Sequence, residues 1–158
     1  MTCVIAIDAG TTGIRSRAVF TDDRPTVAAY REFTQHFPRP GWVEHDPAEI
    51  WTAVRSTLDD VVGQVGRDDV AAIGITNQRE TVVAWDRTTG QPCGNAIVWQ
   101  DRRTAARCAE LAPQLDLVRR RTGLVLDPYF SGTKWEWLLA NRDVPVGEQL
   151  ALGTIDSW

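Results

Sequence analysis

Three apolar, β-prone runs at the start of the chain are joined by very short turns. Residues 4–8 are expected to form a buried strand, 16–21 to return as a second strand, and 26–33 to supply a third. The turns at 9–13 and 22–25 are too short for a crossover connection, so the three strands must be antiparallel neighbours. This pattern defines part of a sheet before any other element is considered.

The first helix is expected to begin after Asp46, which is a good N-cap and is followed by Pro47 at the first helical position. Apolar residues then recur at helical spacing until Gly63 or Gly66 ends the helix. The connection through this helix is long enough for a crossover, so the strand expected at 70–76 is predicted to lie parallel to the first strand. The order of elements indicates an α/β fold with a mixed sheet and flanking helices.

The second half of the chain contains shorter elements. We expect a strand pair formed by 81–85 and 95–99, and a helix capped by Asp101 that runs to about residue 112. Two further helices are expected, at 114–121 and 131–141. Residues 150–158 begin like another buried strand and stop at an exposed Trp, so the chain looks incomplete at its C-terminal end.

Composition restricts the classes of function. A length of 158 residues suggests one domain, and a net charge of −4 argues against nonspecific binding to nucleic acid. No apolar run approaches the roughly 20 residues that a membrane span needs. The three cysteines, Cys3, Cys93 and Cys108, form neither a disulfide framework nor a metal-ligand spacing. We therefore predict a cytoplasmic protein with reduced cysteines.

A turn of small residues follows the first strand, in the segment Asp8-Ala-Gly-Thr-Thr-Gly13. Backbone N–H groups in such a turn can converge on an anion, and Thr hydroxyls add donors. A carboxylate beside a phosphate requires a cation between them, so Asp8 indicates a metal–nucleotide site with Mg²⁺. Arg15 lies just past the turn and can meet a phosphate. An ordinary hairpin, in which Asp8 caps its own turn, is an equally good interpretation of this segment alone.

The run Ile73 to Thr76 leads into Gln78, Arg79 and Glu80, which offer amide, guanidinium and carboxylate groups. Ligands bind at the carboxyl ends of strands in open α/β sheets, and this set of groups suits a small polyhydroxy ligand. A solvated, salt-bridged turn is the alternative.

Trp99 and the following Gln-Asp-Arg-Arg103 also come after an apolar run, so both segments are expected to open on the same sheet edge. The alternatives are core packing for Trp99 and a solvated helix start for Arg102 and Arg103. Tyr129 lies in a constrained turn from which its hydroxyl can point into a cleft, or can bond to backbone inside the protein. His36 and His45 flank a Pro-rich loop and lack a metal-ligand spacing.

These segments together resemble a known family. The chain resembles, over essentially its whole length, the N-terminal part of the glycerol kinases within the FGGY family of carbohydrate kinases. The matching segments are long: Asp8-Ala-Gly-Thr-Thr, Pro40-Gly-Trp-Val-Glu-His-Asp-Pro47, Ile73-Gly-Ile-Thr-Asn-Gln-Arg-Glu80, Asn95-Ala-Ile-Val-Trp-Gln-Asp-Arg-Arg-Thr104, Thr122-Gly-Leu-Val-Leu-Asp-Pro-Tyr-Phe-Ser-Gly-Thr-Lys134 and Gly153-Thr-Ile-Asp-Ser-Trp158.

The resemblance implies a ribonuclease H-like fold of the actin-like ATPase superfamily, in which two domains close around a cleft. It also implies transfer of the ATP γ-phosphoryl, with Mg²⁺, to the 3-hydroxyl of glycerol. The positions that match glycerol-binding ones are Arg79, Glu80, Trp99 and Tyr129. The phosphate-binding turn corresponds to Thr11, Thr12, Gly13 and Arg15, and Asp8 corresponds to the acid near Mg²⁺.

The chain also departs from the family pattern. The family usually has Gln and Ser where this chain has Ala9 and Gly13. The family's catalytic base is an Asp in a Gly-Asp-Gln segment beyond Trp158, and the C-terminal nucleotide-binding domain is likewise absent. Residues 1–158 are therefore expected to be an incomplete N-terminal domain that binds glycerol without phosphorylating it. A noncatalytic polyol-binding or regulatory module, and another FGGY sugar or polyol kinase, are the alternatives, and homo-oligomer formation is left open.

Overall fold

A computed structural model describes residues 2–141 and 147–158 and divides the chain into two compact units. The first unit contains the residues up to Gln35 together with Asp46–Gln78. The second unit contains His36–His45 together with Arg79–Trp158. Each unit has its own four-stranded sheet.

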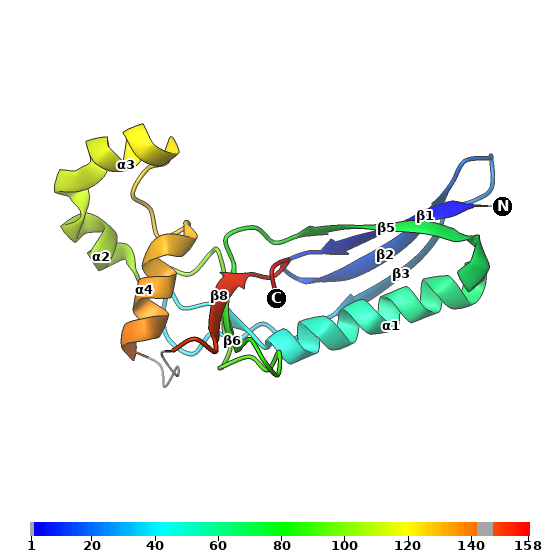
Figure 1. Cartoon of the computed structure of the whole chain (residues 1–158), viewed down its shortest axis with the longest axis horizontal. Coiled ribbons are helices and arrows are strands. Elements are labelled where there is room, and N and C mark those ends of the chain that lie inside the picture. Colours follow the sequence, from blue (N-terminus) through cyan, green and yellow to red (C-terminus); the bar gives the residue numbers. More distant parts are fainter. Residues whose placement is uncertain (1, 142–146) are drawn as a thin grey trace. The chain divides into compact units, whose positions relative to one another are not determined.

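The first unit is a mixed sheet with one long helix on one face, which Figure 1 shows in blue to green. The strand order is β3-β2-β1-β5, with β1 antiparallel to β2, β2 antiparallel to β3, and β5 parallel to β1. The predicted antiparallel strands and the parallel crossover are both confirmed. The elements are β1 (Cys3–Ala9), β2 (Gly13–Phe20), β3 (Val27–Glu32), α1 (Pro47–Val65), the 3₁₀ turn η1 (Arg67–Asp69) and β5 (Val70–Asn77).

Alternation along β1 explains how this sheet packs. Every second residue from Cys3 to Ala9 is buried and the residues between them are exposed, as the two-residue period of a strand requires. Ser16 on β2 hydrogen-bonds Thr57 on α1 at 2.8 Å, inside the layer between helix and sheet. The first strand is therefore buried on one face only, whereas the sequence predicted a buried strand.

Helix α1 begins and ends where the sequence predicts. The Asp46 carboxylate accepts a hydrogen bond from Ala48 N at 2.8 Å, and Pro47 occupies the first turn. At the other end Gly66 has a φ of 88°, a conformation that glycine adopts without strain. Of the two glycines proposed as the stop, Gly66 is the one that ends the helix.

The second unit combines a small antiparallel sheet with short helices, and α4 packs on the sheet through a core of Val82, Ala84, Ile97 and Leu138. The strand order is β4-β7-β6-β8. None of the described helices is long and apolar enough to cross a membrane. The elements are β4 (Glu44–His45), β6 (Val82–Asp86), β7 (Ala96–Ile97), α2 (Ala105–Glu110), the 3₁₀ turn η2 (Ala112–Gln114), α3 (Leu115–Thr122), α4 (Ser131–Asn141) and β8 (Leu150–Thr154).

The predicted pairing of 81–85 with 95–99 is confirmed only at Val82 and Ile97, because β6 pairs along its length with β8 instead. The last residues do not continue as a strand. After Thr154 the chain turns, and the indole N–H of Trp158 donates to Gly90 O at 2.9 Å. This bond leaves Trp158 half-buried, in contrast to the exposed residue that the sequence suggested.

Two other predictions are wrong. The segments that end at Gln78 and at Trp99 do not share a sheet edge, because β5 and β7 belong to different sheets. Asp101 does not cap the next helix, which begins at Ala105 after Thr104. The Asp101 carboxylate instead accepts from Val43 N at 2.7 Å and from Arg103, so it is used to join two loops of the second unit.

Arg103 lies at the centre of a buried cluster of charged and aromatic side chains, whereas the sequence suggested a solvated position for it. Its side chain is fully buried and forms ion pairs with Asp101 at 2.7 Å and Glu44 at 2.9 Å. The guanidinium carbon lies 3.8 Å from the ring centre of Trp42 and 4.5 Å from that of Trp137. Two carboxylates and two indole rings therefore offset the cost of burying this charge.

We predict that Arg103→Met lowers the free energy of unfolding by about 3–5 kcal/mol, because it leaves two buried carboxylates without their cation. The adjacent Arg102 is a matched control, since it is exposed and pairs with the exposed Asp127 at 3.4 Å. Arg102→Met should change stability by less than about 1 kcal/mol. Urea unfolding of both variants measures the difference, and equal losses would contradict the role given to Arg103.

Candidate functional site

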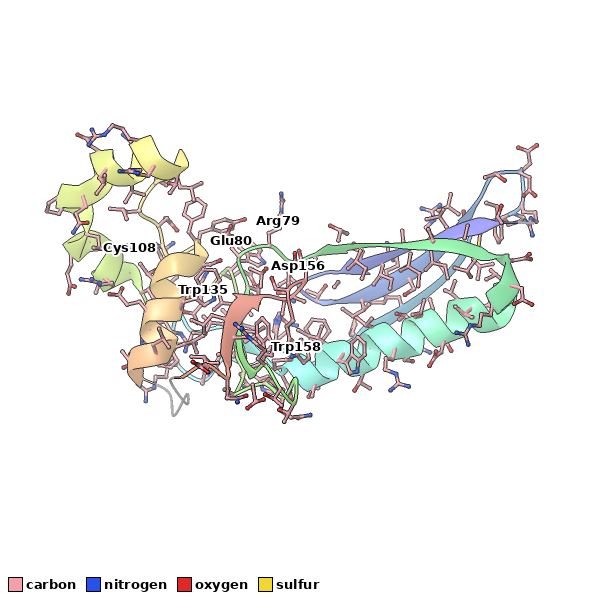
Figure 2. The ribbon with its side chains drawn as sticks, in the orientation of Figure 1. Arg79, Glu80, Cys108, Trp135, Asp156 and Trp158 are labelled. Atoms are coloured by element: carbon pink, nitrogen blue, oxygen red, sulfur yellow. The ribbon has the colours of Figure 1, made fainter. Side chains whose placement is uncertain are left out.

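Arg79 and Glu80 lie at the beginning of the second unit, in the connection that leads to β6. Arg79 is exposed, and its side chain extends away from the ribbon in Figure 2. Glu80 is half-buried and lies toward the start of α4 (Figure 2). The two neighbours therefore offer an exposed cation and a half-buried carboxylate at one place.

The first turn of α4 fixes the Glu80 carboxylate. Glu80 Oε2 accepts hydrogen bonds from Ser131 N at 2.9 Å and from Ser131 Oγ at 2.6 Å. A carboxylate is favoured at a helix N-terminus because the N–H groups there are unpaired and carry partial positive charge. Among the described residues, Oε2 accepts all the hydrogen bonds found for this side chain, so Oε1 can accept one from a ligand hydroxyl.

The backbone of Glu80 has a φ of 64°, and Glu80 is the only described non-glycine residue with a positive φ. This left-handed conformation costs about 1–3 kcal/mol and persists only where the surroundings enforce it. Such strain commonly occurs at functional sites, although strain by itself identifies none.

Trp99 and Tyr129 form an aromatic pair in the same unit. Their ring centres lie 5.8 Å apart at an interplanar angle of 67°, which is an edge-to-face arrangement. Thr81, next to Glu80, accepts a hydrogen bond from Trp99 N at 3.2 Å through its hydroxyl. Both aromatic side chains are half-buried, so each keeps an accessible surface. Three of the four predicted glycerol residues, Glu80, Trp99 and Tyr129, are thus linked by direct contact or through the adjacent Thr81, and Arg79 precedes Glu80 in the sequence.

The turn that carries Tyr129 is constrained as the sequence predicted. Asp127 Oδ1 accepts from Tyr129 N at 2.8 Å, and Asp127 O accepts from Phe130 N at 3.1 Å. The Tyr129 ring also contacts Phe130 edge-on, with centres 5.1 Å apart. These contacts limit the directions in which the Tyr129 ring can point.

Lys134 is the residue that sequence reasoning missed. Its side chain is fully buried, and its ammonium donates to Glu80 O at 3.2 Å and to Tyr129 O at 2.5 Å. Burial lowers the pKa of Lys134 to about 8, while the charges of Glu80, Asp101 and Asp127 partly oppose that shift. The sequence contained one signal that could have drawn attention to this residue, because Lys134 is its only lysine.

The predicted phosphate-binding residues lie in the first unit, around the turn between β1 and β2. Asp8 and Thr12 are exposed, Thr11 is half-buried, and Gly10 N donates to Gly13 O at 3.1 Å to close the turn. Arg15 lies opposite Asp8 in the β1–β2 register, with its guanidinium 5.4 Å from the ring centre of Tyr30.

Gln78 supports this turn, whereas the sequence offered it as a ligand group. It is buried, its N–H donates to Ala9 O at 2.8 Å, and its side-chain amide donates to Gly10 O at 3.2 Å. Gly13 is equally constrained, since a Cβ there would lie 2.6 Å from Arg31 O. Packing against β3 thus leaves no room for a side chain at position 13.

The turn fits a phosphate and its cation by the chemistry of its groups. It presents threonine hydroxyls and backbone N–H groups, which suit phosphate oxygens, and one exposed carboxylate, which suits Mg²⁺. The described residues contain no cluster of three or more His, Cys, Asp or Glu that could hold a metal ion. A metal bound at Asp8 would therefore take most of its ligands from phosphate and water.

We predict that the stability of the wild type rises relative to that of Lys134→Met between about pH 8 and pH 10.5. The pKa of Lys134 is about 8 in the folded protein, against an ordinary value of 10.5. In this interval the unfolded chain binds more protons than the folded one, so deprotonation favours folding. Urea midpoints at several pH values measure the difference, and a constant or falling difference would contradict the lowered pKa.

Comparison with known proteins identifies the family. Residues 3–158 match the N-terminal domain of the FGGY family of carbohydrate kinases. A glycerol kinase of Rhizobium rhizogenes is 54% identical over 165 residues, which cover 98% of this chain and 33% of that protein. This chain thus spans about a third of the length of the curated relatives that it matches.

Solved structures agree with this match. The glycerol kinase of Plasmodium falciparum, solved with ADP, superposes with a TM-score of 0.87 and 31% identity over 100% of this chain and 33% of that one. A xylulose kinase of Rhodospirillum rubrum gives a TM-score of 0.79 and 28% identity over 88% of this chain and 29% of that one. The mixed sheet and flanking helices are those of the actin-like ATPase fold, as predicted. From its sequence and its fold, the chain belongs to the FGGY family of carbohydrate kinases, whose N-terminal domain it matches.

Proposed function

We propose that this chain supplies the glycerol-binding residues and the phosphate-binding turn of an ATP-dependent glycerol kinase. The observation that carries the proposal is the Glu80 carboxylate, which is fixed through Oε2 and keeps Oε1 for a ligand. The glycerol kinases among the relatives support the choice of substrate.

The groups around Glu80 suit a small polyol. Glu80 Oε1 accepts from a hydroxyl, and the adjacent Arg79 donates to a neighbouring hydroxyl. The edge-to-face pair of Trp99 and Tyr129 offers apolar surface to the C–H groups of the ligand. A ligand of this kind is oriented by few polar contacts, so the loss of one contact has a large effect on affinity.

ATP with Mg²⁺ is the phosphoryl donor in this proposal, and its phosphates belong at the turn of Asp8, Thr11, Thr12 and Gly13, with Arg15 beside it. Asp8 would hold the cation through its carboxylate, and the cation would neutralise phosphate charge. The chain's own residues contribute donors and position, which are the main requirements of phosphoryl transfer.

Phosphoryl transfer to glycerol also needs a general base that removes the proton of the hydroxyl. It must lie within hydrogen-bonding reach of the proton that it removes. In the described part of the second unit the acids near Tyr129 are engaged: Asp101 by Arg103 and Val43 N, Asp127 by Tyr129 N, and Glu80 by Ser131. We therefore propose that the 158-residue chain alone binds glycerol but does not phosphorylate it.

The binding test is a glycerol titration of the 158-residue chain, followed by calorimetry. We predict saturable binding that Arg79→Ala and Glu80→Gln each weaken by about tenfold or more, since a lost hydrogen bond to a charged group costs about 1.5–3 kcal/mol. Arg102→Ala is the control, because it removes an exposed arginine of the same unit. Equal affinity in all four proteins would refute the proposed site.

The catalytic test is an assay for glycerol 3-phosphate with ATP and Mg²⁺. We predict no product above the rate without protein, because the acids near Tyr129 are already held by other groups of the second unit. Turnover by the purified chain that Glu80→Gln abolishes would show that this chain contains its own base.

A related pentulose kinase is the second candidate, favoured by the structural similarity to the Rhodospirillum rubrum xylulose kinase. Tighter binding of xylulose than of glycerol in the same calorimetric assay would select it. The cytoplasmic location and the lack of nucleic-acid or membrane partners remain predictions from composition.

A further inference from the structure

Lys134 occupies an unusual position for its residue type. Lysine is almost never fully buried unless its charge is paired, and this lysine is the only one among 158 residues. Its ammonium is satisfied by two main-chain carbonyls, those of Glu80 and Tyr129. The two acceptors are residues that the proposed function assigns to glycerol, and they lie 54 and 5 positions away along the chain.

The same face of α4 also fixes the Glu80 side chain. Ser131 precedes Lys134 by three residues, a spacing that places both on one side of a helix. Ser131 donates twice to the Glu80 carboxylate, while Lys134 donates to the Glu80 carbonyl. The left-handed backbone of Glu80, with a φ of 64°, is thus enforced from α4 at both its side chain and its main chain.

We propose that Lys134 is a positioning residue for the polyol site: without touching the ligand, it sets where the Glu80 carboxylate and the Tyr129 ring lie relative to each other. This inference rests on the proposed function, because it concerns the residues assigned there to glycerol. A merely structural lysine would stabilise the second unit and leave glycerol affinity unchanged in the folded molecules.

The surroundings of the ammonium determine how this role can be tested. The charged and titratable groups around it are the carboxylates of Glu80, Asp101 and Asp127 and the thiol of Cys108 on α2. An ammonium offers three donors and a positive charge, and a neutral amine offers fewer donors and no charge. The bridge between the two carbonyls therefore weakens when Lys134 loses its proton.

Mutagenesis on the 158-residue chain gives the first test. Lys134→Met keeps the unbranched apolar stem but removes the donors, and should raise the Kd for glycerol at least tenfold in molecules shown to be folded by circular dichroism. Leu138→Ala is the matched control, because Leu138 is buried one turn later on α4, in the core with Val82, Ala84 and Ile97. It should destabilise the unit and leave the Kd within about twofold.

A second test uses the wild type and therefore does not depend on whether Lys134→Met folds. Because the sequence contains a single lysine, ¹³Cε-lysine labelling gives one lysine signal in an NMR spectrum. Glycerol should move the titration midpoint of this signal upward, and glycerol affinity should fall by the corresponding factor above that midpoint, because the two effects are reciprocal. The profile is repeated with Cys108→Ala, which removes the thiol beside the ammonium.

The outcomes separate the two proposals. Absence of glycerol binding by the wild type refutes the proposed function of the chain. Normal binding by the wild type, with an unchanged Kd in Lys134→Met or a lysine titration that glycerol does not affect, overturns the positioning role alone. A raised Kd in Lys134→Met with a normal Kd in Leu138→Ala supports it.

Discussion

The structure of the second unit depends on the first turn of helix α4, which donates hydrogen bonds to Glu80 in place of water. The donors are the buried ammonium of Lys134 and the hydroxyl of Ser131. Burying Lys134 costs hydration energy, and that cost is offset because two main-chain carbonyls accept hydrogen bonds from its ammonium. Ser131 adds a charge-assisted hydrogen bond at 2.6 Å. Together these contacts place a carboxylate in a strained backbone conformation that no local preference of glutamate would produce.

The Arg103 cluster provides the same kind of support for the segment that follows Trp99. Asp101 and Arg103 are the second and fourth residues after Trp99, and their ion pair joins this segment to the loop of Trp42–Glu44. Charge in both clusters is buried only where acceptors or counter-charges are available, as physical chemistry requires. The two clusters hold the residues of the candidate site in place. A site for a small polyol needs this support, because few contacts fix so small a ligand.

Local rules predicted the parts of the fold that local interactions decide. Short turns required antiparallel pairing of the first three strands, and Asp46 with Pro47 located the start of α1 to the residue. Predictions failed where a side chain has a distant partner. Asp101 resembles an N-cap in sequence, yet it binds Val43 N, which lies 58 residues earlier. Arg103 resembles a solvated helix start, yet it lies between two indole rings.

The sequence by itself determined the family, the residue types of the candidate site and the approximate position of most elements, because these follow from motifs and periodicity. Only the tertiary structure decided which of those residues are held inside the protein by hydrogen bonds and which are exposed. It divided the segment Ile73–Glu80, using Gln78 to support the turn after β1 and leaving Arg79 exposed. It also revealed Lys134, whose partners lie far apart in sequence, and a contact between such residues exists only after the chain has folded.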